Sequence, residues 1–143
     1  FKEYYDAHCN DNTSPYDSIM ELLEELKVRG IKMAIVSNKI DFAVKSLDKL
    51  YFKDYMTAAI GEMEEEGIRK KPAPDMVQKA LKELQVSAED AIYVGDSDVD
   101  IATAKNSGLE CVSVTWGFRD EEFLKEHGAT NLIDEPVELL NYV

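Results

Sequence analysis

The sequence predicts an α/β protein with a doubly wound parallel sheet and helices on both of its faces. The order helix, glycine, strand recurs three times, at Gly30, Gly108 and Gly128. The predicted strands are continuous apolar runs rather than alternating ones, which is typical of strands buried on both faces. With 143 residues, of which 45% are hydrophobic and 31% are charged, the chain is expected to form one soluble domain with a sizeable core.

The elements follow from the spacing of apolar residues. Ser14 and Pro15 are expected to start a first helix over 16–29, whose apolar residues recur at steps of three and four. A run of β-branched and other apolar residues over 31–36 predicts the first strand. The later predicted elements are a helix over 41–50, a strand over 56–60, a helix after Pro74, a strand over 91–94, a helix ending near Gly108, a strand over 111–115, a helix over 121–126, a strand over 131–133 and a last helix after Pro136.

The charge balance argues against two classes of partner. Sixteen Lys and Arg residues stand against 29 Asp and Glu residues, a net charge of −13 that repels nucleic-acid backbones and anionic lipid surfaces. We therefore expect no nucleic acid and no membrane as partner, and a site for an anionic substrate must supply its own positive charge. Cys9 and Cys111 have no Cys or His at metal-ligand spacing, and the chain opens without an export signal, so a cytoplasmic location is expected.

Polar clusters follow the predicted strands. Ser37 and Asn38 follow the first strand, the segment 95–100 follows the strand over 91–94, and the segment 116–118 follows the next strand. Lys71 lies in a long loop that also follows a strand. Because the carboxyl ends of parallel strands meet at one edge of a sheet, these clusters are expected to form one site.

Each cluster has both a functional and a structural interpretation. Asp96 and Asp100 are four residues apart and can direct two carboxylates at one hard cation, but acidic residues also stabilise the start of a helix. Lys71, which precedes Pro-Ala-Pro, can meet a phosphoryl group as a point charge or simply lie in solvent. Ser37 and Asn38 can hold phosphoryl oxygens or cap the next helix.

The ordered set of motifs resembles the haloacid dehalogenase superfamily of phosphohydrolases, and most closely its phosphoglycolate phosphatase branch. The motifs are Val-Ser-Asn-Lys at 36–39, Lys-Lys-Pro-Ala-Pro at 70–74, Val-Gly-Asp-Ser-Asp-Val-Asp at 94–100 and Val-Thr-Trp-Gly-Phe at 114–118. Each motif alone is weak, but unrelated folds seldom reproduce the ordered set. The resemblance covers nearly the whole chain and implies a Rossmann-like core.

The resemblance implies a Mg²⁺-dependent phosphatase that hydrolyses a small, phosphoglycolate-like phosphate monoester through an aspartyl-phosphate. Its implied catalytic residues are Ser37, which hydrogen-bonds the phosphoryl group, Lys71, which neutralises its charge, and Asp96, which ligates Mg²⁺. Asn38 would join Ser37 and Lys71 in binding substrate, and Asp100 would support the metal directly or through water. Mg²⁺ and Lys71 would supply the positive charge that an acidic protein needs to hold a small phosphorylated metabolite.

One motif of this family is absent from the sequence. The first motif, a DxDGT-like segment that carries the nucleophilic aspartate, ends the central strand in the family and is followed by a helical cap. We therefore expect residues 1–13 to be the last cap helix and residues 14–143 the C-terminal part of the core, with the nucleophile upstream of Phe1. The sheet then lacks its first, central strand, which a missing N-terminal segment or a second chain would complete, and this chain alone is expected to be inactive.

A different functional class fits the same residues. A non-catalytic phosphate- or metal-binding or interaction module would keep the site without the nucleophile, and would bind Mg²⁺ or phosphate without hydrolysis. A phospho-receiver domain also combines carboxylates, a hydroxyl and a lysine. Such domains place their acidic residues on earlier strands, whereas here Ser37 and Lys71 precede Asp96.

Overall fold

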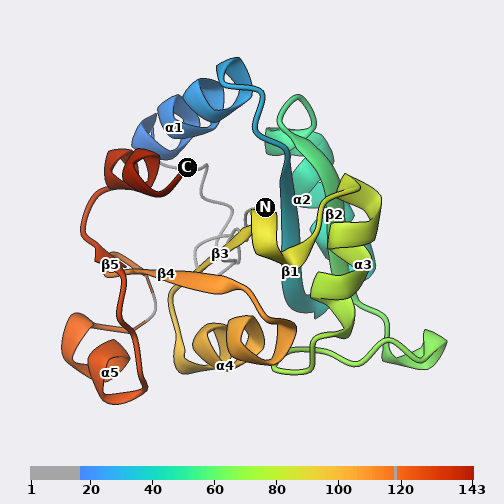
Figure 1. Ribbon diagram of the computed structural model, residues 1–143. Coiled ribbons are helices and arrows are strands. Elements are labelled where there is room, and N and C mark those ends of the chain that lie inside the picture. The colour runs from blue at the N-terminus through green and yellow to red at the C-terminus, as the bar shows by residue number, and fades with distance from the viewer. Residues whose placement is uncertain (1–16, 118) are drawn as a thin grey trace.

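A computed structural model describes residues 17–117 and 119–143 and confirms the alternation of helices and strands (Figure 1). The expected cap helix over 1–13, the predicted start at Ser14 and Pro15, and Cys9 lie outside the described residues. The elements in chain order are α1 (Asp17–Val28), β1 (Met33–Ile40), α2 (Asp41–Leu47), the π-helical turn η2 (Asp48–Phe52), β2 (Met56–Glu62), the 3₁₀ turn η3 (Glu64–Glu66), α3 (Asp75–Leu84), the 3₁₀ turn η4 (Ala88–Asp90), β3 (Ile92–Gly95), α4 (Asp98–Ser107), β4 (Glu110–Val114), α5 (Glu121–Glu126), β5 (Leu132–Ile133) and the 3₁₀ helix η5 (Pro136–Tyr142).

The strands form two parallel sheets. β1 pairs with β2, so that Ala34 lies opposite Ala58 and Val36 opposite Ile60. The second sheet has the order β3–β4–β5, and both of its pairings are also parallel. Within the described residues, β1 and β3 are not paired with each other. The absence of pairing between β1 and β3 agrees with the expectation that the central strand, which would join the two sheets, is not among the described strands.

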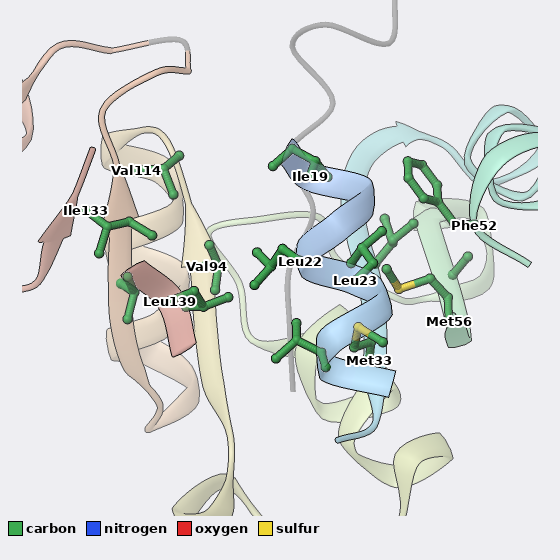
Figure 2. Close-up of a cluster of buried hydrophobic side chains, with 14 of the residues drawn as sticks. Ile19, Leu22, Leu23, Met33, Phe52, Met56, Val94, Val114, Ile133 and Leu139 are labelled. Atoms are coloured by element: carbon green, nitrogen blue, oxygen red, sulfur yellow. The ribbon is translucent and has the colours of Figure 1, made fainter. Parts of the chain in front are cut away.

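Helices cover both faces of the sheets. Successive residues of a strand point to opposite faces, so alternate side chains of β1 pack against different helices. Met33 and Ile35 of β1 join a cluster with buried residues of α1 and η5, while Ala34 and Val36 join a second cluster with α3. The first cluster also contains Val94 of β3, together with residues of β4 and β5 (Figure 2). Both sheets therefore share the same two hydrophobic clusters, as predicted for a doubly wound fold.

The helix boundaries follow local rules. The α1 face buries Leu22, Leu23 and Leu26, the apolar positions that predicted it. Gly30, at a φ of 75°, allows the chain to leave α1 and enter β1. β1 begins two residues later than predicted and continues to Ile40, past the apolar run. None of the described helices is long and apolar enough to cross a membrane.

Candidate functional site

Two polar residues predicted to bind substrate lie near the carboxyl end of β1. Ser37 is buried, and its hydroxyl accepts a hydrogen bond from the Lys39 backbone N–H at 3.1 Å. Asn38 follows on the opposite side of the strand and is exposed. The strand thus directs these two consecutive side chains to different surroundings.

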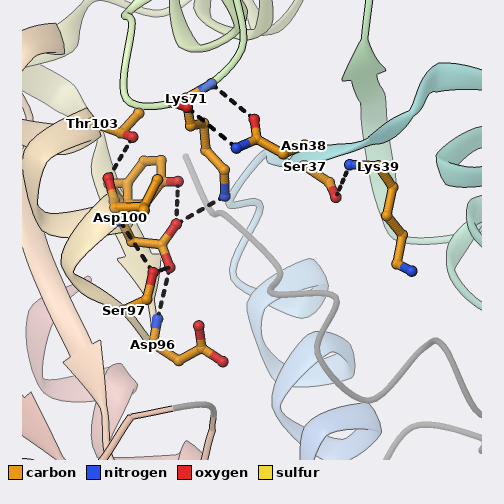
Figure 3. Close-up of polar contacts among 10 residues, drawn as sticks. Ser37, Asn38, Lys39, Lys71, Asp96, Ser97, Asp100 and Thr103 are labelled. Atoms are coloured by element: carbon orange, nitrogen blue, oxygen red, sulfur yellow. Dashed lines mark hydrogen bonds and ion pairs between the residues drawn. The ribbon is translucent and has the colours of Figure 1, made fainter.

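The Asn38 side chain is bound to the backbone of Lys71, 33 residues further along the chain (Figure 3). The Lys71 N–H donates to Asn38 Oδ1 at 2.8 Å, and Asn38 Nδ2 donates to the Lys71 carbonyl at 3.2 Å. Asn106 of α4 holds the next residue, since its Nδ2 donates to the Pro72 carbonyl at 2.9 Å. The loop that carries Lys71 is therefore attached both to β1 and to α4.

The Lys71 ammonium enters a buried polar network centred on Asp100 (Figure 3). Lys71 Nζ lies 2.8 Å from Asp100 Oδ1, which also accepts a hydrogen bond from the Tyr93 hydroxyl at 2.8 Å. The other oxygen, Oδ2, accepts from the Asp96 backbone N–H at 3.0 Å and from the Ser97 hydroxyl at 3.1 Å. The side chains of Lys71 and Asp100 are only 10% and 4% exposed, so this ion pair is largely shielded from water.

These contacts keep Asp100 ionised. Burial of the carboxyl group acts to raise its pKa, but the nearby Lys71 ammonium and the hydrogen bonds from Lys71, Tyr93 and the Asp96 N–H outweigh that effect. The pKa of Asp100 is therefore held below its usual value. A charged Asp100 in turn holds the lysine side chain in a defined position.

Asp96 directly follows β3 and is also buried, with its carboxylate turned away from Asp100 (Figure 3). A methyl group placed on Gly117 would overlap the Asp96 carboxylate, and one on Gly95 would overlap Asp100. Both glycines therefore let the backbone come close to a carboxylate. The Arg119 N–H donates to the Asp96 carbonyl at 3.2 Å, so the segment after β4 reaches the site.

The contacts of the acidic cluster support its interpretation as a helix start, while the metal-binding interpretation stays a prediction. Ser97 caps α4, because its hydroxyl accepts from the Asp100 backbone N–H at 3.4 Å. Asp100, in the first turn of that helix, organises Lys71, while Asp96 faces elsewhere. The helix cap and the polar site are thus built from the same few residues.

The structure brings together the polar clusters that follow β1, β3 and β4, along with Lys71. Two contributors were missed by sequence reasoning. Tyr93 was counted only as an apolar strand residue, although a single tyrosine in an otherwise aliphatic strand three residues before Asp96 is a usable signal. Asn106, near the end of α4, carries no such signal, because its role depends on where the distant Pro72 lies.

The donor set can be tested against the implied Mg²⁺. Among residues 17–117 and 119–143, no three His, Cys, Asp or Glu side chains form a metal-binding group. Mg²⁺ is commonly held by one or two carboxylates, with waters and substrate phosphate completing its octahedron, so a buried Asp96 fits as one of its ligands. Both oxygens of Asp100 already accept hydrogen bonds, which suits a supporting position better than direct ligation.

Several known proteins are similar to this chain in sequence or in fold. A phosphoglycolate phosphatase from Aquifex aeolicus is 36% identical over 119 residues, covering 82% of this chain and 55% of its own length. A candidate pyrophosphatase PpaX from Caldanaerobacter subterraneus subsp. tengcongensis is 33% identical over 144 residues, covering 100% of this chain and 64% of its own length. The crystal structure of a candidate phosphoglycolate phosphatase from Lactobacillus delbrueckii subsp. bulgaricus matches 94% of this chain and 56% of its own, with a TM-score of 0.88 and 41% identity.

This chain thus spans 55% to 64% of the length of these two curated relatives. The family model for haloacid dehalogenase-like hydrolases matches residues 1–114, which is most of the chain. The motifs that predicted this resemblance lie at or near the carboxyl ends of the strands, where the buried network has formed. The chain belongs to the haloacid dehalogenase-like hydrolase family.

Proposed function

We propose that the full-length protein containing this chain is a Mg²⁺-dependent phosphatase that hydrolyses a small phosphate monoester such as phosphoglycolate. The observation that carries the proposal is the buried ion pair of Lys71 with Asp100, whose carboxylate also accepts a hydrogen bond from the backbone N–H of the buried Asp96. A fixed ammonium and a carboxylate suited to Mg²⁺ are the groups that an anionic phosphate ester requires. A relative named phosphoglycolate phosphatase supports a phosphate monoester as substrate, and one named pyrophosphatase supports hydrolysis at phosphorus more broadly.

Each of the site residues would have its own chemical role. Lys71 would neutralise charge on the phosphoryl group, and the Ser37 hydroxyl would hydrogen-bond one of its oxygens. Asp96 would hold Mg²⁺, with Asp100 supporting that site through Lys71 and the Asp96 backbone N–H, or through water. Bound Mg²⁺ supplies further neutralisation of phosphate charge.

The nucleophile would come from outside the printed sequence. An aspartate upstream of Phe1 would attack phosphorus and expel the alcohol, and water would then hydrolyse the aspartyl-phosphate to release inorganic phosphate. Its strand would fit between β1 and β3, which are not paired with each other in the described residues. The division into a cap helix over 1–13 and a core over 14–143, and the cytoplasmic location, belong to the same proposal.

The test compares Asp96→Asn with Asp98→Asn in the full-length protein, using Mg²⁺-dependent hydrolysis of an aryl phosphate. Asp98 lies in the same acidic segment, at the start of α4, and has no role in the proposed site. We expect Asp96→Asn to lower kcat/KM by at least about 100-fold, the scale on which a group that stabilises charge in the transition state acts, and Asp98→Asn to leave it nearly unchanged. Full activity in Asp96→Asn would refute the assignment, and phosphate binding without any turnover in the wild type would favour the non-catalytic module.

A further inference from the structure

We propose that Asn38 is a positioning residue that sets Lys71 for the phosphoryl group, rather than a residue that contacts substrate through its side chain. This inference rests on the proposed phosphatase function. The Asn38 amide uses its oxygen to accept the Lys71 N–H and its nitrogen to donate to the Lys71 carbonyl, at 2.8 and 3.2 Å. Both polar atoms of the side chain are therefore directed at one residue's backbone.

Lys71 needs such support because of where it lies. Between η3 and α3 it belongs to a loop outside the sheet hydrogen bonds, and a lysine side chain has several rotatable bonds. Its backbone is held by Asn38, and its ammonium is held by Asp100. With both ends anchored, the side chain loses much of its freedom before a ligand arrives, and the entropy cost of binding falls.

The two anchors come from different sheets. Asn38 belongs to β1, in the two-stranded sheet, while Asp100 lies in the first turn of α4, which follows β3 of the three-stranded sheet. Lys71 therefore forms a polar connection between the two sheets at their carboxyl edge. Loss of the contact between Asn38 and the Lys71 backbone would therefore change the position of the Lys71 ammonium, although Lys71 itself belongs to neither sheet.

The experiment is a double-mutant cycle in the full-length protein, with Asn38→Ala, Lys71→Ala and the combined variant. The first measurement is the dissociation constant for inorganic phosphate in the presence of Mg²⁺, and the second is kcat/KM with an aryl phosphate. The third is the hydrogen-exchange rate of the Lys71 amide without ligand, which reports the contact itself. The matched control is Asn131→Ala, because the Asn131 amide likewise donates to a distant backbone carbonyl, that of Cys111, and lies near the amino ends of β4 and β5.

We expect Asn38→Ala to accelerate exchange of the Lys71 amide and to raise the phosphate dissociation constant about tenfold, a change equivalent to about 1.4 kcal/mol. In the Lys71→Ala background the same substitution should change the constant less than about twofold, since coupled residues are not additive. Asn131→Ala should alter neither the exchange rate of Lys71 nor phosphate binding.

Three results would overturn the inference. An equal loss of phosphate affinity with and without Lys71 would mean that Asn38 contacts the ligand directly. Faster amide exchange with unchanged phosphate affinity and unchanged kcat/KM would mean that the contact only stabilises the loop. A wild-type protein that neither binds phosphate nor hydrolyses the ester would refute the proposed function as well. This result differs from the first two because it is seen in the wild type, before any substitution is made.

Discussion

Tyr93→Phe removes a single hydrogen bond from the centre of the buried network and leaves the aromatic ring in place. The lost hydroxyl donates to Asp100 Oδ1 at 2.8 Å. Tyr93 is fully buried and Asp100 is 3% exposed, so water does not readily replace the donor. Hydrogen bonds to charged groups contribute about 1.5–3 kcal/mol, and the lower part of that range, about 1.5–2 kcal/mol, applies because Asp100 keeps its bonds to Lys71 and to backbone.

The assay is urea unfolding followed by circular dichroism, with Tyr55→Phe as the matched control. The Tyr55 hydroxyl donates to Glu24 at 3.1 Å on the surface, so its loss should change the free energy of unfolding much less. We expect Tyr93→Phe to lower the urea concentration at the midpoint of unfolding. The slope of the unfolding free energy against urea concentration should not change, since the surface exposed on unfolding is the same. Equal effects of the two substitutions would refute the account of the network.

The pH dependence gives a second check on the same variant. The folded-state pKa of Asp100 is lowered, because the Lys71 ammonium and the hydrogen bonds outweigh the effect of burial. A carboxyl with a lowered folded-state pKa contributes stability above its unfolded-state pKa and loses it as the pH falls through the folded-state pKa. The difference in the free energy of unfolding between Tyr93→Phe and the wild type should therefore be constant at neutral pH. It should shrink as the pH falls below 3.8, the ordinary pKa of an aspartate. A difference that grows in acid would contradict this sign.

Three further substitutions, one of them with a surface control, test the core, a glycine of the site and a helix cap. Leu84→Ala, at a fully buried position, should cost about 2–5 kcal/mol in urea unfolding, whereas Val28→Ala, at an exposed position, should cost less than about 0.5 kcal/mol. Gly117→Ala should weaken Mg²⁺ binding by the full-length protein in calorimetry, because the added methyl group would displace the Asp96 carboxylate; unchanged affinity would argue against Asp96 as a ligand. Asp120→Ala should lower the unfolding free energy by about 1 kcal/mol, because its carboxylate accepts from the Phe123 N–H at the start of α5.

Much of the fold was predictable because it depends on local patterns. The apolar runs gave the positions of the strands, and the positions with helical spacing on α1 and α3 are the ones that are buried. The boundaries were less accurate. β1 extends four residues past the predicted end at 36, and the helix predicted over 41–50 becomes a π-helical turn from Asp48. Pairing with β2 and packing of the turn decide these ends, and neither is a property of the local sequence.

The candidate site was predictable only as a set of residues at one edge. Parallel strands bring their carboxyl ends together, so Ser37, Lys71 and Asp96 could be assigned to one region from their places after the strands. The partners of Asn38 and Tyr93 could not be predicted in this way. Each depends on a hydrogen bond that only a folded chain can form, with Asn38 and its partner 33 residues apart.

The sequence by itself determined the order of the elements, the acidic surface and the resemblance to a family, since these follow from spacing, composition and short motifs. Only the tertiary structure decided that Asp100 pairs with Lys71 while Asp96 faces away, and that an asparagine amide holds the lysine backbone. Side-chain direction and distance at the edge of a sheet depend on how strands, helices and loops pack together. Motif spacing can therefore identify which residues meet, but the folded arrangement determines what each one contacts.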